Sequence, residues 1–212
     1  TIKLTMAQAV IRYLMAQKVE IEGEIKPMFA GCWAIFGHGN VAGLGEALYH
    51  VKEELPTYRA HNEQAMAHSA IAYAKTMNRQ QMMMCTASAG PGSVNMVTAA
   101  AVAHVNRIPV LFLPGDTFAT RMPDPVLQQV ENFHDQTLTS NDCFRPVSRF
   151  FDRITRPEQL LTSLPQAIRV LTDPIECGPA TLGMPQDVQT MAFDYPASFF
   201  DEKVHHLRRQ AP

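Results

Sequence analysis

Short, wholly apolar segments alternate with helix-like segments along this 212-residue chain, and this alternation constrains the fold more than any other feature. Strands that are apolar on both faces belong to parallel sheets, because helices cover such sheets on each side. The sequence therefore predicts an α/β fold: a doubly wound, mostly parallel six-stranded sheet with helices on both faces. We expect the strands at residues 32–36, 57–60, 81–86, 108–113, 150–154 and 179–184.

Apolar residues at helical spacing predict the helices between these strands. In doubly wound sheets, ligands bind beyond the carboxyl ends of the strands. The segments that follow the first four strands are therefore expected to line any site. The helices are expected at 6–18, 41–51, 62–77, 94–105 and 155–171, and the segments of interest are 37–40, 59–63, 88–93 and 114–124.

Charge and composition narrow the range of partners. Lys and Arg number 18 against 20 Asp and Glu, a net charge of −2, and no basic run occurs. We therefore expect no nucleic acid or membrane partner. No apolar run approaches the ~18–20 residues of a membrane span, and no leader-like segment opens the sequence. The four cysteines are widely spaced, which favours reduced thiols in a cytoplasmic protein.

The first motif, Gly37-His38-Gly39-Asn40, directly follows the first predicted strand. With Ala42 it matches the glycine spacing of a dinucleotide-binding turn. The acidic residue that would hold a ribose is missing, although Arg59 could serve a 2′-phosphate. A nicotinamide-dinucleotide-binding domain is therefore one alternative, and glycines that only permit a tight turn are another.

The second motif, Ser88-Ala89-Gly90-Pro91-Gly92-Ser93-Val94-Asn95, joins the third strand to an Ala-rich helix. A Gly-Pro-Gly turn brings the backbone close to whatever lies above it. Free N–H groups at the start of the helix could hold an anion or a polar ring. No zinc-ligand spacing, phosphate-binding Walker loop or Gly-x-Ser-x-Gly elbow occurs in the sequence.

The third motif places Glu63 in the first turn of the next helix. The simplest interpretation is structural, because the helix dipole favours a carboxylate there. The rest of this helix is small and apolar, however, so Glu63 is expected to enter the crevice from a dry wall. Burial in such a wall raises the pKa of a carboxyl group, which suits it to donate or accept a proton. His38, between two glycines at a strand end, is a candidate for contact with the substrate.

Taken together and in this order, the three motifs resemble the pyrimidine-binding domain of the thiamin-diphosphate enzymes, the superfamily of acetolactate synthase and benzoylformate decarboxylase. The resemblance spans about residues 5–188. It implies thiamin diphosphate as cofactor, with Glu63 exchanging a proton with N1′ of the aminopyrimidine. His38 replaces a proline of the family pattern, and Ala89 lengthens the second loop. The implied cofactor-binding residues are Gly37, Gly39, Asn40, Glu63, Ser88, Gly90, Pro91, Gly92 and Asn95.

Segments 36–41, 62–68, 113–121 and 123–129 are similar to one branch of this superfamily. That branch opens the ring of a cyclic diketone, trihydroxycyclohexane-1,2-dione, with water to give 5-deoxyglucuronate in myo-inositol catabolism. The resemblance thus implies a C–C hydrolase with a small-molecule substrate, in which His38 moves a proton on the substrate side. An acetolactate synthase-like enzyme or a decarboxylase of 2-oxoacids or semialdehydes remains an alternative.

The superfamily holds the diphosphate through Mg²⁺ on a Gly-Asp-Gly…Asn motif, which this sequence lacks. No metal ligand is therefore predicted here, and Mg²⁺ is expected only in a C-terminal domain absent from the chain. Residues 1–190 are expected to form the pyrimidine-binding domain, and residues 191–212 a linker toward a middle domain. Because the family's sites lie between subunits, the resemblance implies half a site, and a homodimer or homotetramer.

Overall fold

A parallel sheet of six strands forms the centre of the computed structural model, which describes residues 1–122, 126–130 and 132–207. The strand order is β5-β4-β6-β7-β9-β8, and every pairing in this sheet is parallel. The predicted fold class is confirmed. The strands are β4 (Phe29–Ile35), β5 (Thr57–Tyr58), β6 (Met82–Ala87), β7 (Leu111–Asp116), β8 (Phe150–Arg153) and β9 (Ala180–Pro185).

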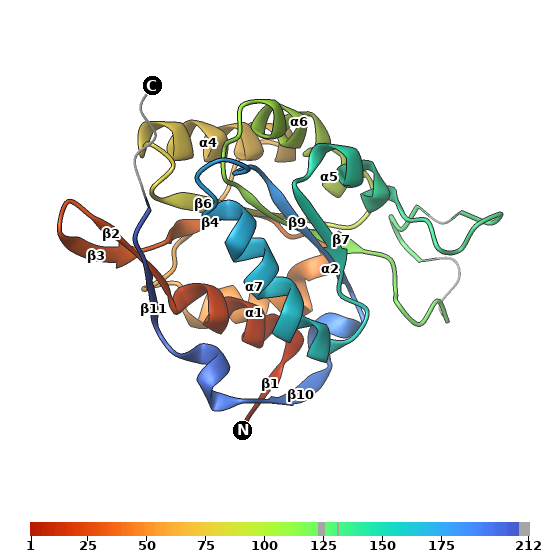
Figure 1. Ribbon diagram of the computed structural model, residues 1–212. Coiled ribbons are helices and arrows are strands. Elements are labelled where there is room, and N and C mark those ends of the chain that lie inside the picture. The colour runs from red at the N-terminus through yellow and green to blue at the C-terminus, as the bar shows by residue number, and fades with distance from the viewer. Residues whose placement is uncertain (123–125, 131, 208–212) are drawn as a thin grey trace.

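Helices cover both faces of this sheet (Figure 1). On one face α4 (Glu63–Thr76) packs beside α6 (Val97–Val105), and on the other α1 (Met6–Met15) packs beside α7 (Leu160–Leu171). The buried residues of α6 are all alanines, and α4 also buries several, so the two helices can approach closely. The Asn62 side chain accepts the Ala65 N–H at 2.8 Å, which fixes where α4 begins.

Four predicted helices have clearly different bounds in the structure. The segment 155–171 begins with a short 3₁₀ helix, η3 (Pro157–Gln159), and its α-helix, α7, starts only at Leu160. The segment 41–51 is a π-helix, η1 (Val41–Gly45), followed by α3 (Glu46–His50). The segment 94–105 is divided, because Pro91 starts a separate turn, α5 (Pro91–Val94), ahead of α6. The first helix ends at Met15 rather than residue 18, because Gln17 already belongs to a strand.

Two small sheets flank the main one, and the sequence did not indicate them because their strands are short and largely polar. One pairs β1 (Ile2–Thr5) with β10 (Ala192–Tyr195), and the other has the order β11-β2-β3. The bounds are β2 (Gln17–Ile21), β3 (Glu24–Pro27) and β11 (Lys203–His205); the short helices are α2 (Gly37–Asn40), η2 (Ser140–Val147), η3 (Pro157–Gln159), η4 (Val188–Thr190) and η5 (Ala197–Phe200).

The predicted linker, residues 191–212, thus contains β10 and β11, which pair with the N-terminal strands β1 and β2. Its assignment as a linker to another domain stays a prediction. Residues 123–125 lie outside the described part of the chain; they belong to the matched segment 123–129, and the first two of them also end the 114–124 segment. Within that part, no helix is both long enough and apolar enough to cross a membrane.

Candidate active site

The loops after β4 and β6 meet the first turn of α4 around an open pocket of about 770 Å³. All three sequence motifs contribute to it, as the parallel sheet requires of segments that follow neighbouring strands. The structure thus brings together residues from positions 35 to 128. The lining residues are Ile35, Gly37, Glu63, Ser88, Pro91, Gly92, Val94, Asn95, Thr98 and Gln128.

Glu63 and Asn95 form the polar pair of this pocket. The Asn95 side-chain amide donates a hydrogen bond to Glu63 Oε2 at 2.8 Å, and thereby joins the second and third motifs. A Cβ atom at position 92 would lie 3.2 Å from Glu63 Oε1, so Gly92 leaves room for the carboxylate. Glu63 is only half-buried. The expectation of a fully dry wall is therefore wrong for this chain, because one side of the pocket is open.

Ser88 supplies a second polar group. Its side chain is buried, and Oγ has no hydrogen-bond partner among the described residues. Gly37, with φ of +52°, packs directly on it: a Cβ atom at position 37 would lie 2.5 Å from Ser88 Oγ. Only glycine fits this approach without strain. An unpaired buried hydroxyl in a pocket wall is a group that a polar ligand can satisfy.

Gln128 enters the pocket from the segment after β7, and no motif indicated it. It has a φ of +61°, and its carbonyl oxygen lies 1.8 Å from the place of a Cβ atom at position 90. Gly90, with φ of +67°, therefore admits this contact where no other residue could. The signal in the sequence was its place in the matched segment 123–129, to which no site residue had been assigned.

Four predicted site residues do not line the pocket. Gly90 instead lies against the backbone of Gln128. The ring Nε2 of His38 contacts the carbonyl oxygen of Leu127. Asn40 is fully buried, and its amide donates to Thr86 Oγ1 and to the Ala87 carbonyl oxygen, both at 2.7 Å. Gly39 is buried against Ala89, whose backbone nitrogen would lie 2.9 Å from a Cβ atom at position 39. Asn40 and Gly39 thus lie behind the pocket wall.

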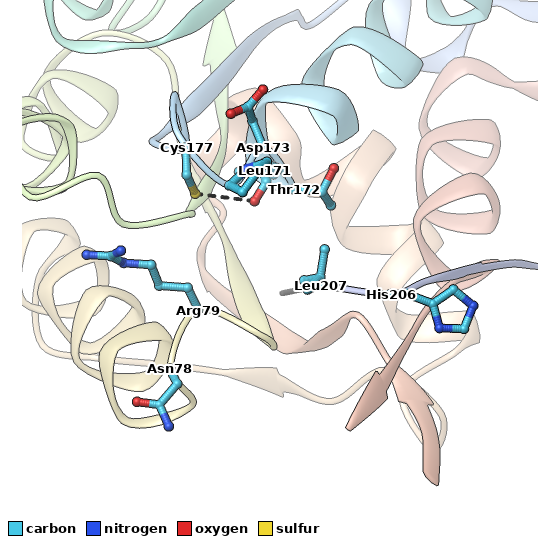
Figure 2. A pocket seen from close by; sticks show the side chains of 9 residues that line it. Asn78, Arg79, Leu171, Thr172, Asp173, Cys177, His206 and Leu207 are labelled. Atoms are coloured by element: carbon cyan, nitrogen blue, oxygen red, sulfur yellow. Dashed lines mark hydrogen bonds between the residues drawn. The ribbon is translucent and has the colours of Figure 1, made fainter. Parts of the chain in front are cut away.

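A second pocket, of about 170 Å³, lies at the amino ends of β6 and β9, away from the motifs (Figure 2). Cys177 lines it and donates its thiol to the Leu171 carbonyl oxygen at 3.4 Å. Burial raises the pKa of Cys177 to about 11. Such a shift disfavours the thiolate, the nucleophilic form, at neutral pH.

The first pocket suits a polar heterocycle better than a metal ion. It offers a carboxylate, a carboxamide and an unpaired hydroxyl, which together can bond to ring nitrogens and an exocyclic amine. No group of three or more His, Cys, Asp or Glu side chains suited to a metal ion occurs among the residues that the structure describes. The donor set is therefore compatible with an aminopyrimidine.

Residues 32–137, half of the chain, match the family described as thiamine pyrophosphate enzyme, N-terminal TPP binding domain. The chain belongs to this family. The match covers all three motifs and replaces the dinucleotide-binding alternative.

The names of curated relatives are more specific than the description of the family. The chain is 53% identical over all of its 212 residues to a 3D-(3,5/4)-trihydroxycyclohexane-1,2-dione hydrolase of Listeria monocytogenes serotype 4b (strain F2365). It is also 53% identical to the enzyme of that name from Bacillus cereus (strain AH820) and 52% identical to that from Listeria innocua serovar 6a (strain ATCC BAA-680 / CLIP 11262). The chain spans about a third of the length of each.

Proposed function

We propose that this chain is the pyrimidine-binding domain of a thiamin-diphosphate-dependent C–C hydrolase. The proposed reaction opens the ring of trihydroxycyclohexane-1,2-dione with water to give 5-deoxyglucuronate. The names of the relatives and the family match support this proposal. The observation that carries it is the Glu63–Asn95 pair, which presents a carboxylate in a pocket lined by two glycine-rich loops.

The residues of this chain would hold the aminopyrimidine and control its protonation. Glu63 would exchange a proton with N1′, and Asn95 would keep the carboxylate in place. Ser88 offers its unpaired hydroxyl, while Pro91 and Gly92 bring the backbone close to the ring. When bound, thiamin diphosphate supplies the electron sink for breaking a C–C bond.

The contact that His38 makes suggests a second role beside the predicted proton transfer, which stays a prediction. Because its ring contacts the Leu127 carbonyl oxygen, we propose that His38 holds the 126–130 segment, and with it Gln128, at the pocket. A role in proton transfer to the substrate would need this contact to break. Gly37 and Gly90 complete the pocket by allowing its loops to approach one another.

The remaining assignments concern parts of the protein beyond this domain. We propose that Mg²⁺ and the diphosphate bind to another domain of a longer polypeptide, since the chain spans about a third of its relatives. The active site would form in the cytoplasm, between this domain and the diphosphate domain of another subunit in a homodimer or homotetramer. The substrate would be a small cyclic diketone.

Glu63→Gln in the full-length protein tests this proposal. Gln keeps the size of the side chain but cannot exchange the proton. We expect hydrolysis, and hydrogen–deuterium exchange at C2 of the cofactor, to slow by about 10²–10⁴-fold. Mass spectrometry follows the reaction, because the product is heavier than the substrate by one water.

Glu46→Gln is the matched control, because Glu46 also lies in the first turn of a helix but is exposed and outside the pocket. Both variants should unfold within about 1 kcal/mol of the wild type, the usual size of a helix-dipole contribution. Normal C2 exchange with a lowered melting temperature in Glu63→Gln would make Glu63 a helix cap and refute the proposal.

A further inference from the structure

Gln189, on η4, is a buried side chain that reaches from the end of β9 into the first motif. It lies outside the pocket lining and outside every motif discussed above. Its amide nitrogen lies 3.1 Å from the Gly39 carbonyl oxygen, 3.0 Å from Asn40 Oδ1 and 2.9 Å from the Met184 carbonyl oxygen. Its Oε1 accepts the backbone N–H of Leu44 at 3.1 Å.

This amide bridges two consecutive helical turns, because Gly39 belongs to α2 and Leu44 to the wide turn η1. Leu44 N–H and the Gly39 carbonyl are five residues apart, the pair that a π-helical hydrogen bond would join. Gln189 bonds to both groups instead. Gly43 makes room for it, because a Cβ atom at position 43 would lie 2.2 Å from Gln189 Oε1. The junction of α2 and η1 is therefore hydrogen-bonded to a side chain distant in the sequence.

The same contacts lead to the pocket. Asn40, which receives one hydrogen bond from Gln189, donates its own amide to Thr86 and Ala87 at the end of β6. Ser88 follows directly and packs under Gly37. A continuous set of buried hydrogen bonds thus connects Gln189 to the two loops that form the pocket wall.

We propose that Gln189 is a positioning residue of the pocket: by bridging Gly39 and Leu44, it fixes the 37–40 loop against the end of β6. The wall formed by Gly37 and Ser88 then faces the aminopyrimidine in one arrangement. The functional part of this inference rests on the proposed function, whereas the effect on the loop does not.

The test compares Gln189→Met with Gln17→Met in the full-length protein. Gln17 is also buried and bonds to the Tyr13 carbonyl oxygen, but it lies on β2, away from the pocket. Hydrogen exchange of a peptide covering residues 39–45, without cofactor, reports on the loop. Calorimetric titration with thiamin diphosphate and Mg²⁺ reports on binding.

In Gln189→Met we expect faster exchange at 39–45. We also expect cofactor affinity weaker by roughly 10-fold to 100-fold, the loss that removal of an outer orienting residue causes at metal sites. Gln17→Met should change neither. Gly43→Ala, which would displace the Gln189 amide without altering it, should reproduce both effects and decides the question if Gln189→Met does not fold.

Unchanged exchange at 39–45 in both site variants would overturn the inference, and so would faster exchange with unchanged cofactor affinity. Failure of the proposed function is separately visible. In that case the wild type would not bind thiamin diphosphate, or Glu63→Gln would retain activity, while the exchange difference at 39–45 would persist.

Discussion

Replacing Arg153 by Met should destabilise this chain strongly, because Arg153 neutralises a buried carboxylate. Its Nε lies 2.8 Å from Oδ2 of Asp116, whose side chain is fully buried. Its Nη2 bonds to Thr139 at 2.8 Å and to Asp142 at 2.9 Å. Removing one partner of a buried ion pair costs about 3–5 kcal/mol, because the remaining charge stays uncompensated. We expect a loss of that size from the free energy of unfolding in urea.

Arg145→Met is the matched control, since Arg145 also pairs with Asp142 but has a side chain that is 58% exposed. Exposed ion pairs contribute about 0–1 kcal/mol. Arg145 also lies 4.5 Å above the Phe151 ring, a contact of similar size. The control should therefore lose about 1 kcal/mol. Equal losses in the two variants would refute the argument that burial of the Asp116 pair sets the cost.

The stability that Arg153 contributes should change with pH in a definite direction. Burial alone would raise the pKa of Asp142, but hydrogen bonds from Arg145, from the Thr139 backbone N–H and from Arg153 lower it below its ordinary value. A depressed pKa in the folded state contributes stability above the unfolded pKa, about 3.9 for Asp. That contribution is lost as the pH falls through the folded pKa. The gap between wild type and Arg153→Met should therefore narrow below about pH 4.

Two predictions concern the 212-residue chain without its proposed further domains. It should bind thiamin diphosphate weakly or not at all, because it contributes no metal site among the described residues, and calorimetry that showed tight, Mg²⁺-dependent binding would contradict this. It should also self-associate through the face of α4 and α6, where exposed side chains such as Ala65, Ser69 and Thr98 are small enough for close approach. Sedimentation that showed only monomer at high concentration would count against this surface.

The main sheet could be predicted from the sequence, because strands buried on both faces appear as short continuous apolar runs. Strands β6, β7 and β9 are buried along their whole length, and their residues are apolar except for Thr86, Asp116 and Thr181. The strands of the two small flanking sheets do not appear as such runs. For example, β3 is largely exposed and pairs only with β2, so its residues are not required to be apolar. Their pairing depends on tertiary contacts that no local pattern encodes.

The residues of the candidate site also divide into those that the sequence indicated and those that it did not. The position of Glu63, Ser88 and Asn95 in one pocket was predictable, because each belongs to a motif that follows a strand of the parallel sheet. Asn40 belongs to a motif as well, yet its side chain faces inward to Thr86. Gln189 and Gln128 belong to none of the three motifs, although each contacts a glycine-rich loop closely. Residue type and spacing thus identify the loops, whereas the direction of each side chain depends on the packing between them.

Under the proposed function, the half-buried state of Glu63 would explain how this domain can hold the proton-exchanging group and still require a partner. A carboxylate that exchanges protons with a bound ring works best where water is excluded, since exclusion strengthens every electrostatic contact. Here three residues beside it remain exposed: Pro91, Val94 and Asn95. Of these, Val94 is an exposed apolar side chain that lines the open pocket. Under the proposed function, the diphosphate domain of a second copy would cover this side. The same surface would then complete the active site and the subunit interface, so a substitution that weakens self-association, such as Val94→Asp, should also weaken binding of the cofactor.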